Sequence, residues 1–154
     1  MLKQTTNSYY IAGQFKLYDK IIKENIREVL PVLVKEILGI NIISREDLPE
    51  SLQHTRETVP DQLSKITDDK GETYILHIEW QSKDDPSMDH RMLNYRAMLR
   101  KKYGLTVKQY VIFLGSPKST MPYIIDEENL KFNYNLIPLQ QYSHKLFLNS
   151  SVPE

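Results

Sequence analysis

Apolar and polar residues alternate over residues 74–81, in the sequence YILHIEWQ. Because successive side chains of a strand point to opposite faces, this pattern predicts a strand with two different faces. One face is apolar and is expected to pack on the core: Tyr74, Leu76, Ile78 and Trp80. The other face carries Ile75 and then a polar row, His77, Glu79 and Gln81. That row is either a solvated stripe or a site.

Two segments have the spacing of amphipathic helices. Over residues 18–38 the apolar positions recur every three to four residues, at Ile22, Ile26, Val29, Leu30, Leu33 and Ile37. Gly39 is its expected stop, and Pro31 predicts a kink or a restart, because proline lacks an N–H and clashes with the preceding turn. Residues 88–103 predict the second helix, which Gly104 ends. Its apolar stripe consists of Met88, Met92, Tyr95 and Leu99.

Turn residues divide the rest of the chain. Residues 44–51, SREDLPES, are expected to form a loop. Strands are expected near residues 52–58 and 61–66, and TDDKGE at 67–72 joins the latter to strand 74–81 as a short hairpin. The apolar run 109–115, QYVIFLG, predicts an interior strand, and 130–139 one further strand, with no closing element after it. The order of helix, strands, helix, strand predicts an α/β fold.

The hairpin has a chemical consequence. Its strands are antiparallel, so the ends remote from the turn lie side by side. Asp61 lies at one such end, and Glu79 and Gln81 at the other, so we expect them to be close. Two carboxylates in a small volume repel each other unless a cation lies between them, and such oxygen ligands suit Mg²⁺ or Mn²⁺. A cation of this kind can polarise a phosphodiester and help to ionise an attacking water.

Composition narrows the classes of protein. A chain of 154 residues, 40% hydrophobic and 26% charged, fits one globular domain. The 20 basic and 20 acidic residues cancel, so any DNA affinity must come from a local patch. The absence of cysteine excludes disulfides and thiolate metal sites, and the histidines at 54, 77, 90 and 144 lack metal-ligand spacing. Without a signal segment or a long apolar run, we expect a cytoplasmic protein that does not contact membranes.

Four motifs in order resemble a known family: VPD at 59–61, HIEWQSKDD at 77–85, MDHRMLNYRAMLRKKYG at 88–104 and VKQYVIFLG at 107–115. They resemble the PD-(D/E)xK nuclease superfamily and, within it, the recombination-promoting nuclease and transposase family. The resemblance covers about residues 18–114. It implies a restriction-endonuclease-like fold, with a mixed central sheet flanked by helices, and a magnesium-dependent DNA endonuclease, which is a hydrolase. It does not imply transposition.

The resemblance also implies roles for individual residues. Asp61 and Glu79 correspond to the metal ligands. The third motif position is usually Lys and is Gln81 here; its neutral amide can orient a water but lacks the charge that stabilises a developing anion. Lys83 is a candidate for that charge if the strand continues, whereas Asp84 to Pro86 favour its end before that point.

Three further assignments concern the helices and the partner. An additional acid often comes from the first helix of this superfamily, and Glu24 is our candidate, ahead of Glu28. Lys83 and Arg91 are the candidate DNA contacts. DNA is the expected partner, and the oligomeric state is left open, with a homodimer as one alternative.

Simpler interpretations exist beside these. Asp61 is otherwise a turn residue after Pro60, Glu79 part of a solvated stripe, and the basic residues of the second helix a solvated face. The alternative function is a catalytically inactive nucleic-acid-binding or protein-interaction module that keeps the fold. The neutral net charge favours it, as does an end at Pro153-Glu154, where relatives continue. We expect one nuclease-like domain over residues 1–154, truncated at its C-terminus.

Overall fold

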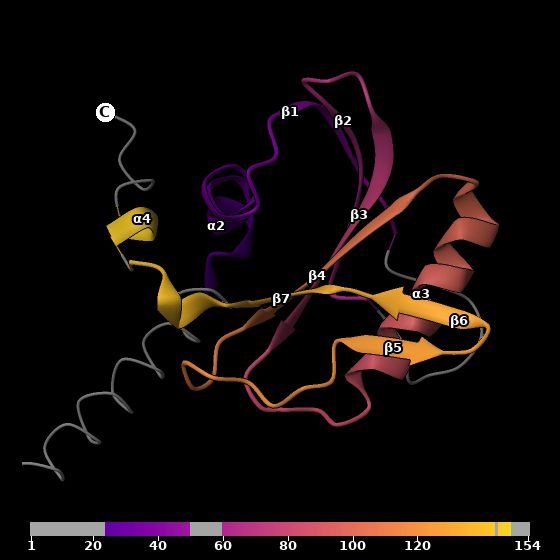
Figure 1. Ribbon diagram of the computed structural model, residues 1–154. Helices are drawn as coiled ribbons and strands as arrows, with labels where there is room; N and C mark the ends of the chain where they lie inside the picture. Colours follow the sequence, from indigo (N-terminus) through magenta and orange to yellow (C-terminus); the bar gives the residue numbers. More distant parts are fainter. Residues whose placement is uncertain (1–23, 50–59, 144, 149–154) are drawn as a thin grey trace, which may run out of the picture. The chain divides into compact units, whose positions relative to one another are not determined.

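The computed structural model describes residues 24–49, 60–143 and 145–148 (Figure 1). The chain divides into two compact units: Met1–Ile40 with Gln140–Glu154, and Asn41–Leu139. The single domain expected from chain length stays a prediction. The strand expected near residues 52–58 lies outside the described residues.

The first unit contains short helices. α2, Ile26–Val32, continues as a π-helix, η1, Leu33–Ile37, and α4, Lys145–Leu148, contacts α2. The helix continues through Pro31 without a restart, and its hydrogen-bonding pattern widens from α to π two residues later. Gly39, with φ of 67°, follows the helix end as predicted. A 3₁₀ turn, η2, Leu139–Gln141, begins at the last residue of the second unit and continues into the first.

The second unit is built on a five-stranded sheet in the order β1-β2-β3-β4-β7. The strands are β1, Ile42–Asp47; β2, Gln62–Asp68; β3, Thr73–Gln81; β4, Val107–Phe113; and β7, Asn135–Pro138. The first three pair antiparallel, and β3, β4 and β7 pair parallel (Figure 1). This mixed sheet, within the order helix, strands, helix, strands, confirms the predicted α/β class with a mixed central sheet.

Two predictions about strands need correction, and the structure adds one hairpin and one short helix that were not predicted. Residues 44–47 of the predicted loop belong to β1, whose side chains beyond Ile42 are exposed and therefore show no alternation; β1 forms through its ladder with β2. The single strand expected at 130–139 is two strands, β6, Leu130–Asn133, and β7. β6 pairs with β5, Ile124–Glu127, in a separate hairpin that the sequence did not predict. Residues 145–148 form the short helix α4, whereas the sequence predicted no closing element after the last strand.

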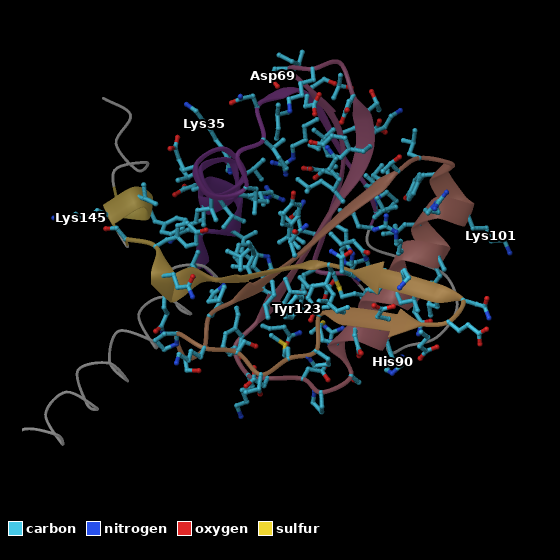
Figure 2. The ribbon with its side chains drawn as sticks, viewed as in Figure 1. Lys35, Asp69, His90, Lys101, Tyr123 and Lys145 are labelled. Atoms are coloured by element: carbon cyan, nitrogen blue, oxygen red, sulfur yellow. The ribbon has the colours of Figure 1, made fainter. Side chains whose placement is uncertain are left out.

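The long helix α3, Met88–Tyr103, has the predicted bounds and the predicted buried stripe, Met88, Met92, Tyr95 and Leu99. These side chains share a core with Ile75 and Val111 of the sheet, and the β5–β6 hairpin adds Ile125 and Phe132. Burying such a side chain contributes about 1.5–3 kcal/mol. The stripe therefore fixes α3 over one face of the sheet, while Lys101 extends outward from the helix (Figure 2).

No helix among the described residues is both long enough and apolar enough to cross a membrane.

Candidate functional site

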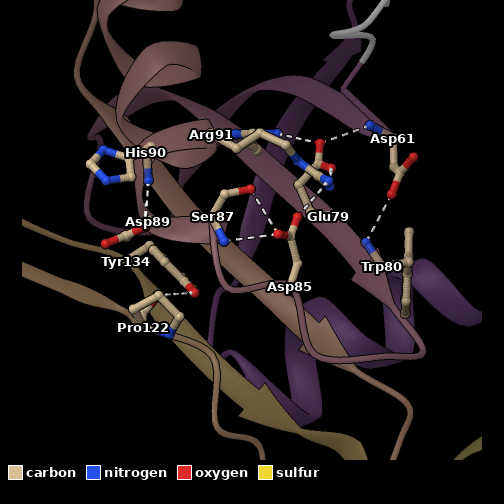
Figure 3. Close-up of polar contacts among 11 residues, drawn as sticks. Asp61, Glu79, Trp80, Asp85, Ser87, Asp89, His90, Arg91, Pro122 and Tyr134 are labelled. Atoms are coloured by element: carbon tan, nitrogen blue, oxygen red, sulfur yellow. Dashed lines mark hydrogen bonds and ion pairs between the residues drawn. The ribbon is translucent and has the colours of Figure 1, made fainter.

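The hairpin of β2 and β3 brings Asp61 beside Glu79. Gln62 pairs with Ile78, so Asp61, the residue before β2, lies opposite Glu79 of β3. The Asp61 backbone N–H donates to Glu79 Oε1 at 3.0 Å, and the Trp80 backbone N–H donates to Asp61 Oδ2 at 2.9 Å (Figure 3). Each carboxylate is thus held by the backbone of the other strand.

The polar row of β3 is buried at two of its three positions. His77 is fully buried and Glu79 is 1% exposed. The imidazole of His77 makes a T-shaped contact with Tyr95 of α3, with ring centroids 4.8 Å apart. The row therefore faces α3, and a solvated stripe is the wrong interpretation for His77 and Glu79.

Three donors surround the Glu79 carboxylate. Oε1 accepts from His77 Nε2 at 2.8 Å as well as from the Asp61 N–H, and Oε2 accepts from Arg91 Nη2 at 2.8 Å. Burial alone would raise the pKa of the Glu79 carboxyl, but these hydrogen bonds hold its pKa below the usual range. Glu79 is therefore an anion at neutral pH, inside the core.

The Asp61 carboxyl is perturbed in the opposite direction. Its side chain is exposed overall, yet loss of water around the carboxylate, and then the negative charge of Glu79, raise its pKa. The Trp80 N–H and the charge of Arg91 only partly offset this. Neighbouring acids whose pKa values are pushed apart are typical of functional sites.

Negative charge is in excess around Arg91. Its Nη1 lies 3.3 Å from Asp85 Oδ2 while its Nη2 binds Glu79, so one guanidinium bridges two carboxylates (Figure 3). Its charge also acts on the nearby Asp61 carboxyl and tends to lower the pKa of that group. Among the described residues, no group of three or more His, Cys, Asp or Glu side chains is arranged to hold a metal ion. Mg²⁺, however, binds through one or two carboxylates together with waters and phosphates. The pair Asp61 and Glu79 fits that requirement if Arg91 leaves Oε2.

Gln81 and Lys83 lie where β3 ends. Gln81 is the last residue of the strand, is half-buried, and shares the face of Glu79 by alternation. Lys83 is exposed in the following loop, so strand parity no longer places its side chain on that face. Their roles in orienting water and contacting DNA stay predictions.

Glu24 is exposed and lies just before α2, in the first unit. Its role as an additional acid stays a prediction. Arg91, predicted as a DNA contact, is instead found on Glu79 and Asp85, so a DNA contact would require one of these partners to release it.

The loops that follow β3 and β4 are joined. The Leu114 N–H donates to the Gln81 carbonyl at 2.7 Å, and Asp84 accepts from Ser119 Oγ at 2.6 Å and from Thr120 Oγ1 at 2.8 Å. A Cβ on Gly115 would lie 2.8 Å from the Ser82 carbonyl oxygen, so only glycine allows this approach. These contacts fix the end of β3, which carries Gln81.

Sequence reasoning missed the participation of Gln109 on β4. This side chain is 2% exposed, and its Nε2 lies 3.2 Å from His77 Nδ1. The signal available in the sequence was an amide next to the apolar run of this strand. The sequence spacing of His77 did not suggest a metal ligand. In the structure, His77 forms a hydrogen bond with the carboxylate of Glu79.

No protein-family model matches the chain, and no curated protein matches it. Among solved structures, it is similar to a chain of an EndoMS–dsDNA2 complex, with 17% sequence identity and a TM-score of 0.35 over 59% of this chain and 35% of that one. The chain therefore spans about a third of the length of the solved chain that it matches.

Proposed function

We propose that this chain is a divalent-metal-dependent DNA endonuclease that hydrolyses phosphodiester bonds at a site formed by Asp61 and Glu79. One observation carries the proposal: each carboxylate accepts a backbone hydrogen bond from the other segment of the hairpin, and Arg91, which also pairs with Asp85, supplies less positive charge than the carboxylates around it carry. The motif resemblance to PD-(D/E)xK nucleases adds to it, because Asp61 and Glu79 occupy the metal-ligand positions of that pattern.

Asp61 and Oε2 of Glu79 would hold Mg²⁺ or Mn²⁺, whereas Oε1 already accepts two hydrogen bonds. When bound, such a cation polarises a phosphoryl oxygen and lowers the pKa of an attacking water. Gln81 would orient that water from the end of β3. Glu24 is kept as the candidate additional acid.

Arg91 and Lys83 would contact the DNA backbone. On leaving Oε2, Arg91 retains its ion pair with Asp85, which leaves Nη2 available for a phosphate oxygen. A planar guanidinium suits this contact because its donors match two oxygens at once. In this scheme one side chain neutralises Glu79 in the resting protein and the substrate in the complex.

A second candidate is a nucleic-acid-binding or protein-interaction module without catalysis. The observation in its favour is the same Arg91–Glu79 ion pair, because an internal cation already neutralises the carboxylate that would bind the metal. In such a module the ion pair would be permanent and structural.

Plasmid nicking separates the two candidates. Supercoiled plasmid is incubated with the protein and Mg²⁺ or Mn²⁺, beside EDTA and the variants Asp61→Asn and Glu79→Gln. Asp126→Asn is the matched control, because Asp126 is an exposed carboxylate of β5 paired with Lys131. We expect EDTA-sensitive nicking that falls at least about 10²-fold in both site variants and not in the control.

Nicking that is absent throughout, or that survives both site substitutions, contradicts the proposal. If nicking is absent while the wild-type protein still shifts the fluorescence anisotropy of a labelled duplex, the binding module is the better description.

A further inference from the structure

We infer that Gln109 and His77 form a buried relay that positions Glu79, by keeping the imidazole proton on His77 Nε2 so that it is donated to Glu79 Oε1. The relay runs from β4 through β3 to the carboxylate, and its consequence for metal binding rests on the proposed function. Nothing in the motif resemblance assigns a role to Gln109.

The two side chains meet across parallel strands. His77 is paired with Gln109 in the β3–β4 register, and both side chains are buried. Gln109 Nε2 lies 2.8 Å from the backbone carbonyl oxygen of Met92 on α3 and 3.2 Å from His77 Nδ1. The amide therefore touches both the helix and the imidazole.

The Met92 carbonyl determines which way the amide points. A carbonyl oxygen can only accept, so the atom of Gln109 next to it must be the amide nitrogen. If the amide were flipped, Gln109 Oε1 would lie 2.8 Å from the Met92 carbonyl oxygen, and two acceptors would then face each other without a hydrogen between them. The same NH₂ group faces His77 Nδ1, which must then accept, and the imidazole proton is left on Nε2.

The proton on Nε2 is the one that Glu79 needs. Nε2 lies 2.8 Å from Glu79 Oε1, which also accepts the Asp61 N–H, so both acceptor directions of Oε1 are used. The T-shaped contact with Tyr95 holds the imidazole ring in place. Only Oε2, bound to Arg91, can exchange its partner for a cation. His77 is thus a positioning residue and not a ligand.

Burying the Gln109 amide lowers stability, which supports a functional reason for an amide at this position. Its Oε1 is buried and has no hydrogen-bond partner among the described residues. Leaving a buried acceptor unpaired lowers stability, so an apolar side chain would suit this interior strand better if packing were the only requirement. The relay explains why an amide stands there.

The tautomer can be measured directly by ¹⁵N NMR of the histidine side chains in the unmodified protein. His77→Gln identifies the His77 signals by their loss. We expect an Nε2–H imidazole with an unprotonated Nδ1. A proton on Nδ1, alone or together with Nε2, overturns the relay.

Metal affinity tests the positioning role. The affinity for Mn²⁺ is measured by electron paramagnetic resonance for the wild type and for His77→Leu, His77→Gln and Gln109→Leu. Removing a hydrogen-bond partner of a metal ligand weakens metal binding about 10–100-fold. We expect such a loss in His77→Leu and Gln109→Leu, and partial rescue in His77→Gln, whose amide N–H can reach toward Oε1. His90→Leu, an exposed change on α3, is the control.

Equal Mn²⁺ affinity in wild type, His77→Leu and Gln109→Leu overturns the positioning role, even if the wild type nicks DNA. Absence of Mn²⁺ binding in the wild type instead overturns the proposed function, and the NMR tautomer then still decides the relay. If His77→Leu does not fold, Gln109→Leu and the measurement on the unmodified protein keep both questions answerable.

Discussion

Replacing Arg91 by Met should make the protein less stable without a divalent cation and more responsive to one. Met keeps much of the apolar length of the side chain but removes the guanidinium from Glu79 Oε2 and Asp85. Glu79 then remains an anion in the core with two donors, His77 and the Asp61 N–H. A cation bound at Oε2 would restore the missing charge.

The magnitude follows from the burial of the two partners. Breaking a fully buried ion pair costs about 3–5 kcal/mol, and losing a single charge-assisted hydrogen bond about 1.5–3 kcal/mol. Glu79 is 1% exposed, but Arg91 is 28% exposed and two donors remain, so the lower range applies. We expect a loss of about 2 kcal/mol, which lowers Tm by about 4–8 °C in a chain of this size.

The assay is thermal unfolding with and without Mn²⁺. A ligand at 100 times its Kd stabilises the folded state by about 2.7 kcal/mol, enough to recover the loss. In the wild type, the cation must first displace Arg91 from Glu79 Oε2, so Mn²⁺ should raise the Tm of the wild type less than that of Arg91→Met. Arg100→Met, an exposed change on the same helix, should behave like the wild type. Arg91→Met should nick DNA more slowly despite its tighter Mn²⁺ binding, because the proposed contact of Arg91 with a phosphate would be lost.

Equal Tm shifts with Mn²⁺ in wild type and Arg91→Met would refute the reasoning, because Arg91 would then not occupy the oxygen that the cation needs. A variant as stable as the wild type without Mn²⁺ would show that the Arg91–Glu79 ion pair contributes no net stability.

Three further predictions concern single positions. The folded-state pKa of Asp61 is raised, so its ionisation opposes folding as the pH rises through that pKa. In urea unfolding at pH 7, Asp61→Asn should therefore have a higher free energy of unfolding than the wild type. This difference in free energy should vanish at a pH below the usual pKa range of aspartate. Gly115→Ala should lower the free energy of unfolding by about 1–3 kcal/mol, because its Cβ would meet the Phe113 ring and the Ser82 carbonyl oxygen. Gln81→Ala should lower kcat for nicking about 10²-fold, with little change in Mn²⁺ affinity, because it removes the amide that we propose orients the water and removes no proposed metal ligand. An unchanged kcat would exclude Gln81 from the reaction.

The local pattern of apolar and polar residues was sufficient to predict the elements that position Asp61 and Glu79. Alternation in β3 and the turn at Gly71 define the hairpin, and its register follows from them. The stripe of α3 was equally clear because four buried side chains recur at helical spacing. Both signals lie within short stretches of chain.

Contacts between distant residues could not be predicted in this way. Alternation separates the two faces of β3, but it does not say that α3 covers the polar one. The contact between His77 and Gln109 crosses two parallel strands 32 residues apart, and the ion pair of Arg91 with Glu79 joins a helix to a strand. Likewise, β1 was missed because its exposed side chains have no alternation of burial.

Anomalous diffraction from Mn²⁺-soaked crystals tests the metal site most directly. We predict one strong peak at about 2.1 Å from an oxygen of Asp61 and from Oε2 of Glu79, with Arg91 moved from Glu79 to Asp85 alone. A map with no peak between these carboxylates, and with Arg91 still on Oε2, would contradict the proposal that Asp61 and Glu79 bind the catalytic cation.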